Sequence, residues 1–247
     1  MIDMSVITSI FRRELASYFT TPLAYVFIVI FLALNGVFTF YIGGWYEREQ
    51  ADLMPFFDFH PLLYLFLIPA LSMRLWAEER KTGTIELLMT LPISTWRAVT
   101  GKYLAAWVFS GVALALTFPV WLTVNYLGNP DNAVIAVGYA GSFLMAGAYL
   151  AIGSCVSAFT QNQVIAFVIT VVICFIFVLS GTPMVLDLFQ GWLPQTLVNT
   201  IGGMSITTHL NTILKGVIDV RDLIFFLSFI ICWLLANIIV VEMKKSD

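Results

Sequence analysis

The chain has 247 residues, of which 60% are apolar and 11% are charged, and its mean hydropathy is +0.92. A soluble domain carries about 25% charged residues, so this composition excludes an ordinary soluble protein and indicates a membrane protein. The net charge of -3 is small and dispersed, which argues against a nucleic-acid partner. The three cysteines lie in apolar stretches, at spacings that predict neither a disulfide nor a metal site.

Residues 1–21 predict an amphipathic helix that lies in the headgroup layer of the membrane. Apolar residues recur there at helical spacing, and Arg12 and Arg13 lie on the opposite face. The sequence alone favours a lipid anchor for the first membrane span. The alternative is a lever that passes movement from a cytoplasmic partner to that span.

Six apolar stretches then predict six transmembrane helices, since about 20 apolar residues suffice to cross a bilayer. Residues 132–186 contain no charged side chain and are long enough for two spans, separated by the polar turn 160–163. The predicted fold class is therefore an all-α, polytopic membrane protein. The six predicted spans are 22–43, 55–73, 103–127, 135–159, 164–186 and 222–241.

The orientation follows from the basic residues. All of the 12 Lys and Arg residues except Arg48, Lys215 and Arg221 lie on the side that holds both termini. Because loops rich in Lys and Arg stay inside the cell, both termini are predicted to be cytoplasmic. A cluster of Gly, Ala and Ser in the span 135–159 indicates close helix packing, more within one subunit than between two.

Two segments outside the spans stand out. Residues 74–102 form the densest polar region, in which Gly83 permits a sharp bend and exposed leucines suggest a docked partner. The alternative is a solvated hairpin that merely follows the positive-inside rule. Residues 187–221 carry many polar side chains and several glycines, and predict short amphipathic helices at the external interface, with a re-entrant loop as the alternative.

Missing groups exclude several functions. No predicted span has an ionisable residue at its centre, which disfavours proton- or ion-coupled transport. His60 and His209 lie in or near external loops, far apart in the sequence, and offer neither a protease site nor a metal site. The pair Gly101-Lys102 lacks the other residues of a phosphate-binding loop, so any ATP site is expected on another chain.

Three stretches resemble a known family: 79–94 with Gly101-Lys102, 157–163 with Ala166, and 205–222. They are similar to the membrane subunit of type 2 ABC exporters, and in particular to the gliding-motility-associated permease branch. The resemblance implies six spans, an amino-terminal connector helix and a first cytoplasmic loop that docks on an ATPase. It also implies a bacterial inner-membrane location and no catalytic residue or cofactor in this chain.

The resemblance further implies partners and site residues. The permease works as a homodimer or pseudo-homodimer on two ATPase subunits, which bind ATP and Mg, and a second membrane protein with an external domain can accompany it. The ATPase-docking residues are Glu78, Glu79, Arg80, Lys81, Thr82, Gly83, Thr84, Glu86, Leu87 and Leu88. The second cytoplasmic contact is Thr160, Gln161, Asn162 and Gln163, and the connector residues are Phe11, Arg12, Arg13 and Leu15. The external segment contributes His209, Gly216, Asp219, Arg221 and Asp222.

Three functions follow from these features. The leading hypothesis is a noncatalytic permease subunit driven by a separate ATPase. The second is an anchor or mechanotransmission subunit that couples an ATPase to an external machine for motility or cell-wall remodelling, and the third is a secondary transporter or channel. Replacing Glu79 and Glu86 by Lys is expected to uncouple the ATPase and leave the fold intact, because both residues are predicted to lie outside the membrane. No residue identifies the substrate.

Overall fold

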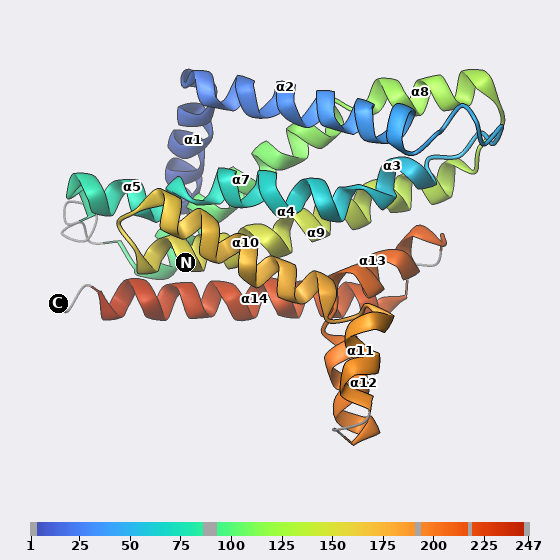
Figure 1. Cartoon of the computed structure of the whole chain (residues 1–247). Helices are drawn as coiled ribbons and strands as arrows, with labels where there is room; N and C mark the ends of the chain where they lie inside the picture. Colours follow the sequence, from blue (N-terminus) through green and yellow to red (C-terminus); the bar gives the residue numbers. More distant parts are fainter. Residues whose placement is uncertain (1–3, 86–92, 191–193, 217–218, 245–247) are drawn as a thin grey trace.

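The computed structural model describes residues 4–85, 93–190, 194–216 and 219–244, and helices are the only regular secondary structure within these ranges. The long helices run alongside one another, as Figure 1 shows. Five of them are long and apolar enough to cross a membrane: Ala24–Ile42, His60–Thr82, Thr95–Leu127, Asn132–Phe159 and Val220–Met243. The prediction of an all-helical protein with several membrane spans is therefore confirmed.

The predicted fifth span, 164–186, corresponds to a shorter apolar helix. Helix α10 (Gln163–Leu179) has 17 residues, which at 1.5 Å per residue makes it about 26 Å long. The hydrocarbon core of a bilayer is about 30 Å thick. The count of six spans thus stays a prediction.

Helix α1 (Met4–Thr20) stands across the direction of the next helix, α2 (Pro22–Gly36), which continues as the π-helix η1 (Val37–Ile42). The chain turns at Thr21, whose backbone is extended, and Pro22 is well suited to the first turn of a new helix because no helical hydrogen bond is needed there. The predicted amphipathic helix is present. Ile10 on its apolar face packs against Gly101, so that face rests on another helix of the chain.

The predicted second span, 55–73, is covered by α3 (Met54–Asp58) and α4 (His60–Ser72), and α5 (Arg74–Thr82) follows directly at their end. The chain is helical again from Arg74, beyond the predicted end of the span at residue 73, and this helix ends only at Gly83. The membrane limit at residue 73 stays a prediction. Charged side chains do not stop a helix, whereas Gly83 does: its φ of +72° is a left-handed conformation that glycine adopts readily. The first part of the predicted loop 74–102 is therefore helical.

The third span consists of α7 (Thr95–Ala115) and α8 (Phe118–Leu127), which are separated at Leu116 and Thr117. The helix begins eight residues before the predicted start of the span at residue 103, and that membrane limit stays a prediction. Ser94 has the extended conformation of a residue that precedes a helix, so α7 begins at Thr95, and Lys102 lies two turns inside it. Hydropathy could not predict that neighbouring helices bury Lys102.

Helix α9 (Asn132–Phe159) is the central helix, and it packs against α4, α7, α10 and α14. Its small residues allow this close packing. A Cβ atom added at Gly147 would lie 2.7 Å from Nε1 of Trp107, and one at Gly153 would collide with Ser72. At these positions, packing within one subunit is the correct alternative.

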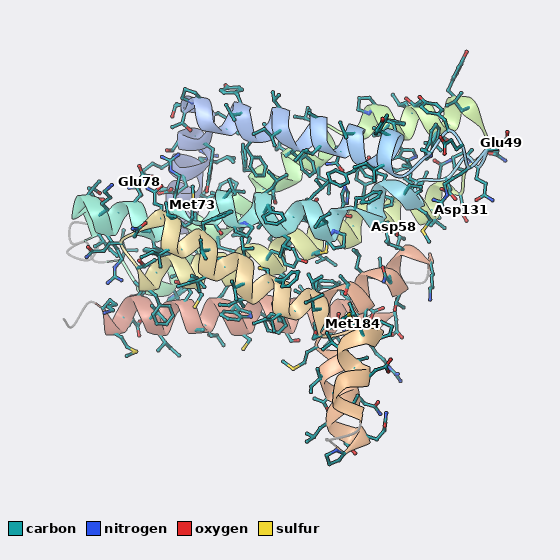
Figure 2. All side chains as sticks on the ribbon, viewed as in Figure 1. Glu49, Asp58, Met73, Glu78, Asp131 and Met184 are labelled. Atoms are coloured by element: carbon teal, nitrogen blue, oxygen red, sulfur yellow. The ribbon has the colours of Figure 1, made fainter. Side chains whose placement is uncertain are left out.

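The predicted fifth span, 164–186, is not one continuous helix. Helix α10 ends at Leu179, and a turn through Gly181 leads to Pro183, which begins a new helix. Three short helices follow, as the sequence predicted: α11 (Pro183–Gln190), α12 (Gln195–Gly203) and α13 (Ile206–Leu214). Helices α11 and α12 contact each other and project away from the bundle, with Met184 at their base (Figures 1 and 2).

The last helix, α14 (Val220–Met243), runs back along α9. Figure 2 places Glu78 at one end of the long helices and Glu49, Asp58 and Asp131 at the other. We call the end that holds α5 and the start of α7 the basic end, and the end that holds α13 and the start of α14 the opposite end. The basic end corresponds to the predicted cytoplasmic side.

Candidate functional site

A buried lysine joins three helices at the basic end. Lys102 on α7 is only 2% exposed, and its Nζ lies 2.7 Å from Oε1 of Glu79 on α5 and 3.3 Å from Oε1 of Glu14 on α1. The ammonium group also lies over the ring of Trp76, 5.2 Å from its centroid. A buried charge is tolerated only when it is paired, so these two carboxylates fix the relative positions of α1, α5 and α7.

Arg13 adds a peripheral contact to this lysine cluster, which comprises Lys102, Glu14 and Glu79. Its guanidinium lies 2.8 Å from Glu14 and 4.0 Å from Glu79, and its side chain is 59% exposed. Burial raises the pKa of Glu14, but the nearby cations Lys102 and Arg13 outweigh it and hold that pKa below its usual value. Glu14 is therefore a carboxylate at neutral pH.

Ser157 ties the central helix to the junction of α4 and α5. Its hydroxyl accepts hydrogen bonds from the backbone N–H groups of Trp76 and Ala77, both at 3.1 Å, and donates one to the carbonyl of Met73 at 2.9 Å. A helix that restarts leaves such groups without partners inside the helix. The hydroxyl supplies those partners, so the break at Met73 is held against α9.

Arg80 makes a further link between α5 and α9. Its Nη1 donates to the carbonyl of Ala158 at 2.6 Å, next to the turn that follows α9. In that turn, the side chain of Asn162 accepts from the backbone N–H of Val164 at 2.9 Å and begins α10. The first predicted docking region and the second predicted contact are thus neighbours in space.

The other docking residues are mostly accessible. Glu78 is 44% exposed and pairs with Arg74 at 2.8 Å, while Lys81, Thr82, Gly83 and Thr84 are exposed. In the turn, Gln161 and Asn162 are exposed, and Thr160 and Gln163 are partly buried. Glu86, Leu87 and Leu88 lie outside the described residues, so their predicted docking role stays a prediction.

Glu79 differs from these residues because it is only 21% exposed and pairs with Lys102. Replacing it by Lys would place two ammonium groups beside each other. The structure therefore argues against the expectation that this replacement leaves the fold intact. On α1, Phe11 and Leu15 are partly buried, whereas Arg12 is exposed.

The opposite end holds a smaller polar site. Nδ1 of His209 on α13 lies 2.5 Å from Oδ1 of Asp222 on α14, and Nε2 lies 2.9 Å from the carbonyl of Gly203. Asp219 caps α14 by accepting from the backbone N–H of Arg221, whose side chain is exposed. Gly216 has a φ of +81°, which a side chain would strain.

His60, predicted in or near an external loop, lies at the start of α4 in a fully buried position. Its Nε2 donates to Oδ1 of Asn35 at 3.1 Å, and the hydroxyl of Ser142 lies 2.7 Å from Nδ1. These contacts join α2, α4 and α9. Within the described ranges, no group of three or more His, Cys, Asp or Glu residues is arranged to hold a metal ion.

Glu14, Lys102 and Ser157 are central to the basic end, yet the sequence pattern did not identify them as a site. Glu14 is the only acidic residue of α1, and that could have suggested a partner. Lys102 is the last residue of the predicted loop 74–102, because the predicted third span starts directly after this charge. Ser157 carries no signal of its own, since serine is common in closely packed membrane helices.

No curated protein matches the chain. Residues 21–241 match the model of the ABC-2 family transporter protein. This range includes α5, Lys102, the turn after α9 and the His209–Asp222 pair, and it begins just after α1. Members of that family are membrane subunits of transporters, generally noncatalytic, and the family implies an ABC ATPase as partner. This multi-pass membrane protein therefore belongs to the ABC-2 transporter family.

Proposed function

We propose that the chain is the permease subunit of a bacterial ABC exporter in the inner membrane. Two permeases, identical or similar, work with two ATPase subunits that bind ATP and Mg and supply the energy. The observation that carries this proposal is the buried Lys102, which joins the connector helix α1 to α5. Such a joint suits a part that must move as one body when a partner pushes on it.

The path of movement runs from α5 into the bundle. Helix α5 follows α4 after a single intervening residue, Met73, so a push on α5 is passed directly to the second span. Lys102 passes it to α1 and α7, and Ser157 with Arg80 passes it to α9. The links made by Lys102 and Arg80 are charge-assisted hydrogen bonds, which are stronger than neutral ones. They therefore favour movement of the helix ends together.

The surface of this chain on which the ATPase docks consists of the exposed side of α5 and the turn after α9. Lys81 and Thr82 are exposed on α5, and Gln161 and Asn162 are exposed on the turn. The hydrogen bond from Arg80 to Ala158 keeps the two parts adjacent. One partner surface can therefore contact both, and Glu86 to Leu88 extend the same docking segment along the chain.

A second candidate function is force transmission to an external machine, as in the gliding-motility branch. The α11–α12 hairpin favours it, because it projects from the bundle and exposes Met184 and Leu197, a surface on which an external partner could dock. Exporter and transmission subunit share the docking surface. They differ in whether ATP turnover moves a substrate across the membrane.

The test is affinity purification of the tagged chain in mild detergent, followed by mass spectrometry and an ATPase assay. The proposal predicts a co-purifying ABC ATPase with vanadate-sensitive turnover. Replacing exposed Lys81 by Glu should weaken its binding, and the matched change at the opposite end, Lys215→Glu, should leave binding unchanged. A chain that purifies alone under several gentle conditions would contradict the proposal.

A further inference from the structure

A cavity of about 560 Å³ opens at the basic end between α1, the α4–α5 junction and α7. This is within the range of small-molecule sites, roughly 300–1,000 Å³. Its charged lining residues are three basic and three acidic: Arg13, Arg74, Lys102, Glu14, Glu78 and Glu79. Leu71 and Leu75 supply an apolar wall.

The balance of charge indicates the kind of ligand. An anion would meet the carboxylates of Glu78 and Glu79, and a cation would meet the guanidinium groups of Arg13 and Arg74. A zwitterion can satisfy both sets, with its phosphate on arginine, which binds phosphate through two parallel hydrogen bonds. Lys102 is buried and paired with two carboxylates. Arg13 pairs with Glu14 at 2.8 Å and Glu78 pairs with Arg74 at 2.8 Å, but the side chains of Arg13 and Glu78 are 59% and 44% exposed, so a ligand can reach both pairs.

One acceptor in the cavity lining has no donor. Oε2 of Glu79 is buried and makes no hydrogen bond within the described structure, although Oε1 of the same carboxylate contacts Lys102. Buried polar atoms are nearly always hydrogen-bonded, so this oxygen calls for an N–H or O–H group. A primary ammonium group can donate to it, whereas a trimethylated ammonium group has no hydrogen to give.

The surface next to the cavity is apolar and suits the hydrocarbon chains of a lipid. Tyr18 and Thr21 line it at the corner where α1 meets α2. Just beyond that corner, α2 exposes the apolar side chains of Tyr25, Val26 and Val29. A molecule with its polar group in the cavity can therefore lay its hydrocarbon chains along α2.

We propose that this cavity binds the headgroup of a zwitterionic phospholipid that carries a primary ammonium group. The phosphate contacts Arg13 and Arg74, the ammonium group contacts Glu78 and Oε2 of Glu79, and the acyl chains follow α2. The bound lipid lies between the connector helix and α5 and supports their contact. This site does not depend on the proposed transport function.

Native mass spectrometry of the detergent-purified chain tests the proposal. Phosphatidylethanolamine, phosphatidylcholine and phosphatidylglycerol with identical acyl chains are added at equal concentrations. The ethanolamine lipid should be retained about tenfold better than the other two, a difference of about 1.4 kcal/mol. The choline headgroup has no hydrogen to give to Oε2 of Glu79, and the glycerol headgroup has no cation for Glu78. Equal retention of all three lipids, or preference for another, would overturn the proposal.

Two variants and one control locate the site. The double variant Arg74→Gln with Glu78→Gln keeps the net charge and should abolish the preference. The control is Glu242→Gln with Lys244→Gln, at the same end, in the last turn of α14 and directly after it, and it should retain the preference. If the double variant unfolds, the single variant Arg13→Gln, at an exposed position, takes its place in the experiment. It should weaken retention of the ethanolamine lipid severalfold. Unchanged retention in the folded variants would contradict the site.

A soluble competitor separates a lipid from a free zwitterion. Glycerophosphoethanolamine carries the same headgroup without acyl chains. It should displace the bound lipid only in large excess, because the apolar contacts with α2 are missing. Displacement at equal concentration would mean that the cavity holds a soluble zwitterion, and the lipid assignment would fail.

Discussion

The two ends of the bundle are held together in different ways. At the basic end, Lys102 contacts Glu14, 88 residues away in the chain, and Glu79, 23 residues away. At the opposite end, the His209–Asp222 pair joins two consecutive helices and spans only 13 residues. The ion cluster at the basic end therefore joins distant elements, whereas the ion pair at the opposite end fixes a local corner. Near that end, the distant helices α4 and α9 are joined without an ion pair, by the contact of His60 with Ser142. In the proposed function an ATPase pushes on the basic end, and the ion cluster there would make its helices move together.

Removing the cation of Lys102 should have the largest effect. In Lys102→Met, Glu14 and Glu79 lose their shared partner, and breaking a buried ion pair in this way costs roughly 3–5 kcal/mol. Thermal unfolding of the detergent-solubilised chain measures the loss. Lys81→Met on the exposed side of α5 is the control and should unfold like the wild type. Equal stability of both variants would mean that the lysine cluster does not hold the basic end together.

Breaking the pair at the opposite end should cost less. Asp222→Ala removes the carboxylate that accepts from His209, and loss of a hydrogen bond to a charged group costs about 2 kcal/mol. The same unfolding experiment measures it, with exposed Asp187→Ala as the control. If Asp222→Ala were as damaging as Lys102→Met, the contrast between the two ends would be wrong.

Ser157→Ala tests the link between α9 and the α4–α5 junction. The backbone N–H groups of Trp76 and Ala77 lose their acceptor, and the expected cost is about 1 kcal/mol, since hydrogen bonds between membrane helices contribute little individually. Hydrogen exchange of these two amides should accelerate. Ser180→Ala, whose hydroxyl bonds only within its own turn, should leave their exchange unchanged.

The pH dependence of stability gives the smallest effect. The pKa of Glu14 is lowered in the folded protein from its usual 4.5, so the unfolded chain binds its proton first as the pH falls. The stabilisation by Glu14 is fully present above pH 4.5 and is lost as the pH falls through the lowered pKa. Unfolding curves of Glu14→Gln should therefore approach those of the wild type in acid. A stability difference that stayed constant across this range would contradict the assignment.

The sequence predicted the architecture better than the limits of its elements. The long charge-free stretches correctly indicated membrane helices, because apolar length alone decides whether a helix can span. The helix limits differ from the predicted span limits where a charge marks the predicted limit, at Arg74 and Lys102, and where no charge marks one, at Leu179. Helices end at caps and breaking residues such as Gly83, and hydropathy does not detect these.

The candidate site was located only in part. The charge density of residues 74–102 correctly indicated the polar end of the second span, and the turn at 160–163 lies beside it. The pairing of Lys102 with Glu14 was out of reach, because it depends on how α1 packs on α7. The buried contact of His60 with Asn35 and Ser142 was missed for the same reason.

The central claim is that the basic end receives the ATPase, and site-specific photocrosslinking in the native membrane tests it most directly. A photoreactive amino acid is placed at Lys81 or Gln161 at the basic end, and at exposed Asn211 at the opposite end. The account predicts that the first two positions crosslink to an ABC ATPase and that the third does not. Crosslinking to the ATPase from Asn211, with none from Lys81 or Gln161, would contradict it.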